Sequence, residues 1–183
     1  MAATKKKEEK NAMAVINQNI KSGEFAKIYL LYGKERYLVN QYRDKLLGAL
    51  TDKADNLNFM KFAGNGINTQ EIIDFSNEMP FFADRRVVLV ENSGLFKSSN
   101  EDFAKKLINI EDTSVVIFVE MEVDTRYKLF KAVDKSGEAL EFVTPDEKMM
   151  VTWVRSLFRE SEVATTDTAI YRIIECAKMD MNC

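Results

Sequence analysis

Continuous apolar runs are the feature that most limits the folds open to this chain. They are Ile28–Tyr32, Val87–Val90 and Val115–Val119, and each is followed by a stretch in which apolar residues recur at helical spacing. A run of four or five apolar residues without alternation is typical of a strand that is buried on both faces. Buried strands separated by helices predict an α/β fold with a mainly parallel sheet covered by helices on two sides.

Further elements are expected from helical spacing, short apolar stretches and capping residues. The expected helices extend from Ala12 to a stop at Gly23, over Tyr37–Leu50, over Gln70–Asn77 with Thr69 as N-cap, from a cap at Ser99 or Asn100 to about Ile108, and from a cap at Asp124 through Val133. The expected additional strands are Phe59–Phe62 and Leu140–Val143. Only two prolines and seven glycines occur, which disfavours a sandwich or barrel with many tight turns.

The alternation of strands and helices breaks at Pro145, and only helical segments follow, over about 147–160 and 167–180. We therefore expect three parts: a charged start and first helix over 1–25, an α/β domain over 26–144, and the start of a small helical domain over 145–183. Two helices make a thin domain, so we expect the sequence to be a truncated piece of a longer protein.

Composition excludes several classes of function. The chain contains no histidine, so it has neither a Ser-His-Asp or Cys-His nucleophile system nor an imidazole metal ligand. Cys176 and Cys183 form no CxxC motif, which is consistent with a reduced, cytoplasmic environment. No apolar run approaches the ~20 residues of a membrane span, so no membrane association is expected. The formal charge of −3 gives no sign of a dedicated nucleic-acid binder.

Gly33 follows the first apolar run, where a phosphate-binding loop would lie. Such a loop needs the pattern GxxxxGK[ST], but this segment has one glycine, no Ser or Thr after Lys34, and Glu35 in a position to repel phosphate. We interpret Gly33 as a strand terminator. Glu91 and Glu120 end two of the runs, but neither belongs to an Asp-Glu pair, and we interpret them as solvated surface acids. No cofactor or metal site is expected.

An aromatic pair, Phe81 and Phe82, follows Met79 and Pro80 in front of the Val87–Val90 run. Adjacent side chains on a regular element cannot both enter one core, so at least one ring is expected to point elsewhere. One interpretation is that both rings tuck beneath the loop, and the other is that they form an exposed anchor for a partner protein. The residues alone leave these two interpretations nearly level.

A charged segment, Asp84-Arg85-Arg86, follows the aromatic pair. It could form a polar rim around an anchor, or it could be a solvated turn.

Taken together, these segments resemble the delta subunit of the bacterial DNA polymerase III clamp loader over about residues 26–181. The segments that carry the resemblance are Ile28–Gly33 with Glu35 and Tyr37-Leu38, Met79–Val90, Ile117–Glu120 with Val123–Lys128, and Trp153-Val154. The order and spacing of these segments carry more weight than any one of them.

The resemblance implies an AAA+-like fold of the P-loop NTPase type that has lost ATP hydrolysis, followed by a small helical (lid) domain. A third helical domain for oligomerisation would be missing here. In the family, a hydrophobic pair enters a pocket on the ring-shaped sliding clamp. By motif position this pair is Phe81 and Phe82, with Met79 and Pro80 beside it and Asp84 and Arg85 as a possible rim. Family members often have an aliphatic residue at the position of Phe81.

The function implied by the resemblance is a non-catalytic clamp-loader subunit that binds and opens the beta sliding clamp for loading onto DNA during replication. The implied partners are the clamp, the gamma/tau and delta-prime subunits through the missing domain, and primed DNA in the full complex. The subunit would be part of the DNA polymerase III holoenzyme, a nucleotidyltransferase, without being an enzyme itself. The alternative is an AAA+ ATPase that binds and hydrolyses nucleotide. The related delta-prime subunit is disfavoured because its cysteine zinc cluster and Ser-Arg-Cys finger are absent.

Overall fold

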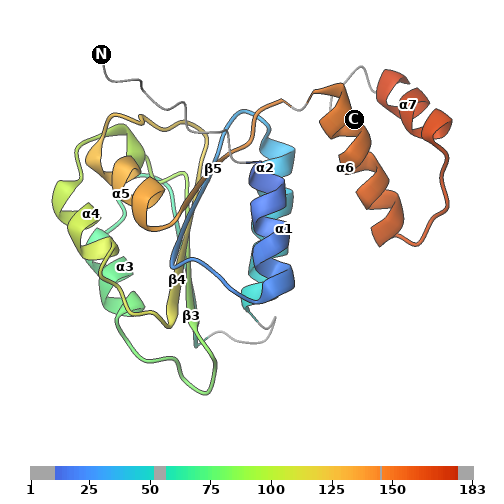
Figure 1. Cartoon of the computed structure of the whole chain (residues 1–183). Coiled ribbons are helices and arrows are strands. Elements are labelled where there is room, and N and C mark those ends of the chain that lie inside the picture. The colour runs from blue at the N-terminus through green and yellow to red at the C-terminus, as the bar shows by residue number, and fades with distance from the viewer. Residues whose placement is uncertain (1–10, 52–56, 145, 177–183) are drawn as a thin grey trace, which may run out of the picture. The chain divides into compact units, whose positions relative to one another are not determined.

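The computed structural model describes residues 11–51, 57–144 and 146–176 (Figure 1). The chain divides into two compact units, Met1–Phe142 and Val143–Cys183. Within the described residues, no helix is both long and apolar enough to cross a membrane.

The first unit is built on a five-stranded sheet in which every pair of neighbouring strands is parallel. The strands are β1 (Ile28–Tyr32), β2 (Phe59–Ala63), β3 (Arg86–Glu91), β4 (Ser114–Glu120) and β5 (Glu138–Glu141), in the order β2-β3-β4-β1-β5. Every residue of β3 and β4 is buried, because these central strands are covered on both faces. The expected mainly parallel sheet is confirmed.

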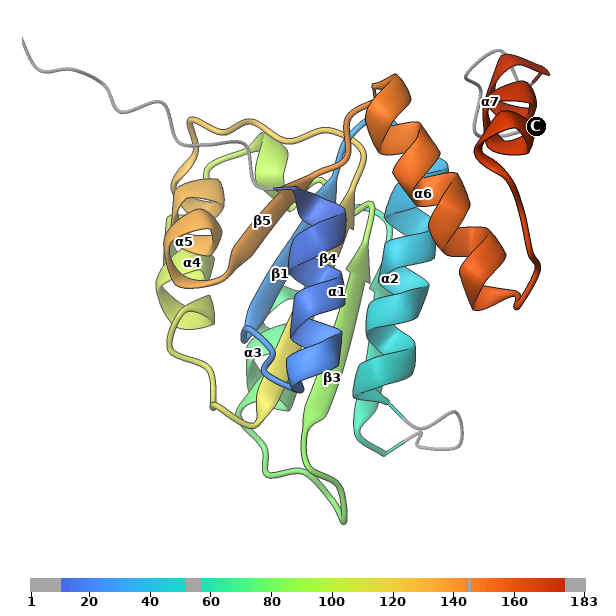
Figure 2. The ribbon, with the colours of Figure 1, turned by 45° about the vertical axis from the view of Figure 1, so that its right-hand side comes forward.

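Helices cover both faces of this sheet. They are α1 (Ala12–Ser22), α2 (Arg36–Leu50), α3 (Thr69–Ser76), α4 (Glu101–Leu107) and α5 (Lys128–Ser136), with a short 3₁₀ turn η1 (Leu95–Lys97). Figures 1 and 2 show α1 and α2 on one face and α3, α4 and α5 on the other. The core between the sheet and the second group of helices includes Phe118, whose ring lies 5.2 Å from that of Phe96 and 6.2 Å from that of Phe103, between centroids.

The second unit contains α6 (Glu147–Glu160) and α7 (Asp167–Cys176), which pack against each other. Asp146 is the N-cap of α6, because its carboxylate accepts a hydrogen bond from the Met149 amide at 2.7 Å. The helix expected over 147–160 is therefore confirmed. The second helix was expected to reach residue 180, and the part of that expectation after Cys176 lies outside the described residues.

Two expected helix caps, Thr69 and Asp124, are wrong, and a third, Asn100, is at the expected position without a capping side-chain bond. The α3 cap is Asn68, whose Oδ1 accepts from the Gln70 amide at 3.0 Å, so Thr69 is already the first helical residue. Asn100 precedes α4 but makes no capping bond, because its amide donates to the Leu95 carbonyl at 2.7 Å instead. Asp124 lies before a turn and α5 begins only at Lys128.

Asp124 is occupied by a partner within its own turn. The Arg126 guanidinium and backbone amide donate to its carboxylate, with the shortest N–O distance at 2.6 Å, and these bonds lower the pKa of Asp124 to about 2. A local side-chain turn has replaced the helix cap, as aspartate commonly allows.

β5 begins two residues earlier than expected and ends at Glu141 rather than Val143. Its pairing with β1, from Tyr29 opposite Glu138 to Tyr32 opposite Glu141, fixes this register. β5 is an edge strand, and only Leu140 in it is buried. It therefore lacks the apolar run that marks the central strands.

Candidate functional site

The expected partner-binding residues lie in one loop, residues 77–85, which joins α3 to β3 and is called here the aromatic loop. Phe82 is 95% exposed, Phe81 55% and Met79 85%, while Pro80 is half-buried. The two phenyl rings pack edge to face with centroids 4.6 Å apart. The interpretation that both rings tuck beneath the loop is therefore wrong, and the loop presents an apolar tip to solvent.

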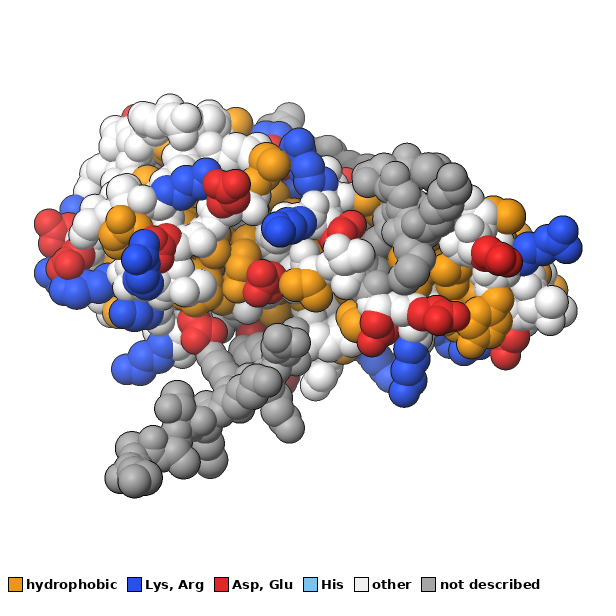
Figure 3. All heavy atoms as spheres, turned by 90° about the horizontal axis from the view of Figure 1, so that it is seen from above, with side chains coloured by type: hydrophobic (Ala, Val, Ile, Leu, Met, Phe, Trp, Pro, Cys, Tyr) orange, Lys and Arg blue, Asp and Glu red, His pale blue; other side chains and the backbone are white. Residues whose placement is uncertain are grey.

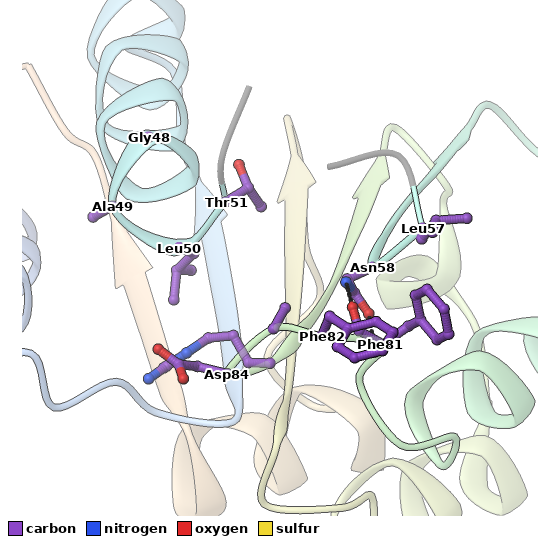
Figure 4. Close-up of a pocket in the computed structure, with 11 residues that line it drawn as sticks. Gly48, Ala49, Leu50, Thr51, Leu57, Asn58, Phe81, Phe82 and Asp84 are labelled. Atoms are coloured by element: carbon purple, nitrogen blue, oxygen red, sulfur yellow. Dashed lines mark hydrogen bonds between the residues drawn. The ribbon is translucent and has the colours of Figure 1, made fainter. Parts of the chain in front are cut away.

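The Phe81 backbone is held by a buried amide. Asn58, which is 3% exposed and directly precedes β2, accepts from the Phe81 N–H at 2.7 Å and donates to the Phe81 carbonyl at 2.8 Å. Figure 4 shows the Asn58 side chain beside Phe81. Phe82 has a φ of +51°, a left-handed backbone conformation that is unusual for a bulky residue.

Arg86 holds the other side of the loop. Its Nε donates to the Met79 carbonyl at 3.0 Å, Nη1 donates to the Leu57 carbonyl at 3.3 Å, and Nη2 pairs with Glu78 at 3.0 Å. The guanidinium also lies 4.4 Å from the centroid of the Phe75 ring. Arg86 is buried, so its expected place in a polar rim or solvated turn is wrong.

Asp84 and Arg85 complete the charged segment. Asp84 is exposed, and Arg85 is half-buried with its guanidinium 5.0 Å from the centroid of the Phe25 ring. Both line the same hollow as Phe81 and Phe82, and Arg85 also packs on the protein itself.

An open hollow of about 710 Å³ lies between the C-terminal end of α2 and the aromatic loop (Figure 4). Phe81, Phe82 and Leu57 all line it, and Leu57 is 62% exposed. Sequence reasoning missed Leu57, as well as the loop-holding Asn58. Neither belongs to a motif, and only the exposed position of Leu57 beside the loop identifies it.

The carboxyl ends of the strands lie at the other end of the sheet from the aromatic loop. In α/β folds of this kind, ligands bind at the carboxyl ends of the strands. Gly33 follows β1 there, as expected of a strand terminator, and has a φ of +132°. A Cβ at this position would lie 2.2 Å from the Phe142 carbonyl oxygen. The glycine is therefore explained by the close approach of two backbone segments.

Glu91, at the end of β3, was expected to be solvated, but it is buried. Its carboxylate pairs with Arg43 Nη1 at 2.6 Å and with Lys61 Nζ at 2.5 Å. Burial alone would raise the pKa of Glu91, but the hydrogen bonds and charges of Lys61 and Arg43 outweigh it and hold the pKa below its usual value. The carboxylate and Arg43 line a hollow of about 220 Å³.

Glu120, at the end of β4, is also buried, so its expected solvated position is wrong too. It accepts hydrogen bonds from the Ser93 amide at 2.9 Å, from the Gly94 amide at 3.3 Å and from the Ser93 hydroxyl. Its carboxylate therefore holds the turn that follows β3. In the part of the chain that the structure describes, no cluster of three or more His, Cys, Asp or Glu residues is arranged to hold a metal ion.

Charged side chains of both signs are interspersed on the face seen in Figure 3, which views the molecule from above relative to Figure 1. Of the described lysines and arginines, Lys97, Lys105 and Lys128 each form an ion pair with a nearby acid. The distribution on this face agrees with the small net charge of −3.

Comparison with known proteins gives a consistent result. A family model described as DNA polymerase III, delta subunit, matches residues 29–143. The fold is similar to that of the Bacillus subtilis DNA clamp loader delta protein, with a TM-score of 0.74 and 20% identity over 88% of this chain and 51% of that one. It is also similar to a DNA polymerase III gamma subunit-related protein from Thermotoga maritima, with a TM-score of 0.52 and 14% identity over 86% of this chain and 57% of that one.

No curated protein sequence matches the chain. The chain spans about half the length of the Bacillus subtilis protein. The two structural likenesses bear on the fold, and they confirm the expected AAA+-like class.

Proposed function

Since the chain belongs to the DNA polymerase III delta subunit family, we propose that it is a non-catalytic clamp-loader subunit that binds the beta sliding clamp and opens it for loading onto DNA. The observation that carries this proposal is the exposed aromatic tip formed by Phe81 and Phe82. Large apolar side chains that protrude from a fixed backbone are the groups in which binding energy concentrates.

The proposed contact has an apolar centre and a polar edge. Phe81, Phe82 and Met79 supply the apolar area, with Pro80 at its base, and Asp84 supplies charge at the rim. Fully burying one phenyl ring is worth roughly 1.5–3 kcal/mol. Because Phe82 is 95% and Phe81 55% exposed, burial of the two rings accounts for about 2 kcal/mol or more, which is about 30-fold or more in Kd.

We also propose that the chain has no ATPase activity. Glu91 and Glu120, which end the central strands β3 and β4, are each engaged by neighbouring donors of the protein itself. The space beside Gly33 is taken by the Phe142 backbone. These contacts favour the non-catalytic role over the alternative of an AAA+ ATPase.

The proposed mechanism is mechanical. The aromatic tip docks in an apolar pocket of the clamp, and the clamp ring is held open at one of its interfaces. ATP bound by the gamma/tau subunits would control when the tip is accessible, which requires that the tip be contacted differently in two states of the assembly. In this proposal, gamma/tau and delta-prime are contacted through a further domain of the complete subunit, and primed DNA is a partner of the full complex.

The test is isothermal titration calorimetry of the chain with the sliding clamp of the same organism. We expect the wild-type chain to bind and the double variant Phe81→Ala/Phe82→Ala to lose at least about 30-fold in affinity. A matched control is Tyr171→Ala/Ile173→Ala, which truncates two apolar side chains that are exposed on α7. The control should bind like the wild type.

Two results would contradict the proposal. Equal affinity of the Phe81→Ala/Phe82→Ala variant and the wild type would move the contact to another surface. Absence of binding by the folded wild-type chain would overturn the clamp-binding function itself.

A further inference from the structure

We propose that Asn58 and Arg86, called here the supporting pair, are positioning residues that preset the aromatic loop for binding. This inference rests on the proposed clamp-binding function. Neither residue presents its side chain to solvent, since Asn58 is 3% and Arg86 8% exposed. They act through the backbone of the residues that carry the apolar tip.

Asn58 links the aromatic loop to the sheet. Its own carbonyl accepts from the Val87 amide at 2.8 Å, which fixes the Asn58 main chain to β3. Its side chain then meets both backbone polar groups of Phe81, at 2.7 and 2.8 Å. The Asn58 side-chain amide thus bonds to the Phe81 N–H and C=O as the backbone of a neighbouring strand would, although residues 77–85 form no strand.

Arg86 supports the loop from its other side. Its amide donates to the Thr113 carbonyl at 2.9 Å, so the first residue of β3 is itself fixed. Its guanidinium reaches the Met79 carbonyl, two residues before Phe81. The supporting pair therefore holds the backbone on both sides of Pro80.

The conformation that the supporting pair maintains is one that the aromatic loop would not favour by itself. Phe82 has a left-handed φ of +51°, a conformation with a free-energy cost for a residue that is not glycine. Because its ring is 95% exposed, packing of the ring offsets little of this free energy. Such a residue keeps its conformation only where the surroundings over-determine it. The backbone bonds to Asn58 and Arg86 supply this constraint.

A preset loop binds more tightly, because the observed Kd equals the intrinsic Kd divided by the fraction of molecules in the competent conformation. Loss of one support that lowers this fraction to about a tenth would weaken binding about tenfold, with both phenyl rings still present. The effect is therefore on presentation of the rings and not on the contact surface.

The experiment compares Asn58→Ala with wild type by calorimetry against the sliding clamp, and by hydrogen–deuterium exchange of the free chain. We expect about tenfold weaker binding and faster exchange of the Phe81 amide, with exchange in β3 unchanged. The matched control is Asn100→Ala, which removes another side-chain bond to a loop carbonyl, that of Leu95 at 2.7 Å. Asn100→Ala should leave the affinity for the clamp and the exchange of the Phe81 amide unchanged.

A second variant, Asn58→Asp, is included in case Asn58→Ala does not fold. Its carboxylate can still accept from the Phe81 amide but cannot donate to the Phe81 carbonyl, and its second oxygen would face that carbonyl, so we expect weaker binding than that of the wild type. Wild-type affinity in whichever Asn58 variant folds, or equal weakening by Asn100→Ala, would overturn the positioning role and leave the clamp-binding function standing. If the wild type itself does not bind, the proposed function fails, and the role of the supporting pair in binding fails with it.

Discussion

Gly33 shows how a single residue can be constrained by backbone contact. Its φ of +132° and the 2.2 Å that would separate an added Cβ from the Phe142 carbonyl oxygen leave no room for a side chain. We expect Gly33→Ala to lower the free energy of unfolding by about 2–3 kcal/mol, from backbone strain and overlap. Urea denaturation measures this change.

Gly48 provides the control for that measurement. It lies inside α2, and a Cβ there would meet nothing within 4 Å. Alanine is a better helix former than glycine, so Gly48→Ala should raise the free energy of unfolding by about 0.5–1 kcal/mol. A Gly33→Ala variant as stable as the wild type would show that the segments around Phe142 separate without cost.

Single residues also show where sequence reasoning stops. The protrusion of at least one ring of Phe81 and Phe82 could be expected, because neighbouring side chains cannot share one core direction. The buried roles of Arg86 and Glu91 could not, because their partners lie far away in the chain, as with Leu57 and Arg86 (29 residues) or Arg43 and Glu91 (48 residues). A charged residue is most often exposed, and only folding reveals a partner that reverses this expectation.

At the scale of elements, Glu91 joins α2, β2 and β3 by its ion pairs with Arg43 and Lys61. Because the pKa of Glu91 is lower in the folded chain than in the unfolded chain, these contacts stabilise the fold at pH values above about 4.3. The contribution is lost as the pH falls through the lower pKa of the folded state. Glu91→Gln should therefore lower the free energy of unfolding by about 1–2 kcal/mol at pH 7, allowing for partial exposure of Lys61, and by less at acidic pH.

Urea denaturation across pH 3–7 tests this expectation. The control is Glu122→Gln, whose carboxylate is paired with Lys97 at 2.9 Å on an exposed surface. It should leave the stability at pH 7 unchanged. A Glu91→Gln variant with the stability and pH dependence of the wild type would show that the ion pairs do not stabilise the fold.

The success of element prediction depended on burial. β1, β3 and β4 could be located from sequence because strands covered on both faces must be apolar throughout. Of the two edge strands, β2 was located to within one residue, whereas β5, in which only Leu140 is buried, was displaced by two residues. The start of α5 was missed because Asp124 bonds to Arg126 within its own turn, and the sequence does not distinguish such a turn from a helix cap.

For the α/β unit as a whole, the amino ends and the carboxyl ends of the parallel strands differ in how their side chains are exposed. β3 begins at Arg86, which supports the aromatic loop, and ends at Glu91, which is enclosed by its ion pairs. The amino ends of the strands thus carry exposed apolar side chains, while Glu91 and Glu120 at the carboxyl ends are buried and bonded to neighbouring groups of the protein itself. In the proposed function, this fold binds a protein partner at the amino ends of its strands instead of a nucleotide at the carboxyl ends.

The last prediction follows from this division and concerns ATP. We expect no binding of Mg²⁺–ATP, because Arg43 is engaged by Glu91 and the backbone beside Gly33 is closed by Phe142. The measurement is thermal unfolding with and without about 5 mM Mg²⁺–ATP. A site with a Kd of about 50 μM would be stabilised by about 2.7 kcal/mol under these conditions, whereas we expect no shift in Tm.

An ATP-hydrolysing AAA+ protein, measured in parallel, serves as the positive control for the nucleotide and metal. A shift of Tm in this chain would mean that it binds nucleotide, and release of inorganic phosphate would favour the alternative ATPase function. An unchanged Tm together with clamp binding would show that the chain binds the clamp but binds no nucleotide at the carboxyl ends of its strands. The chain would then recognise its partner without nucleotide, and any dependence of clamp opening on ATP would have to come from the other subunits of the assembly.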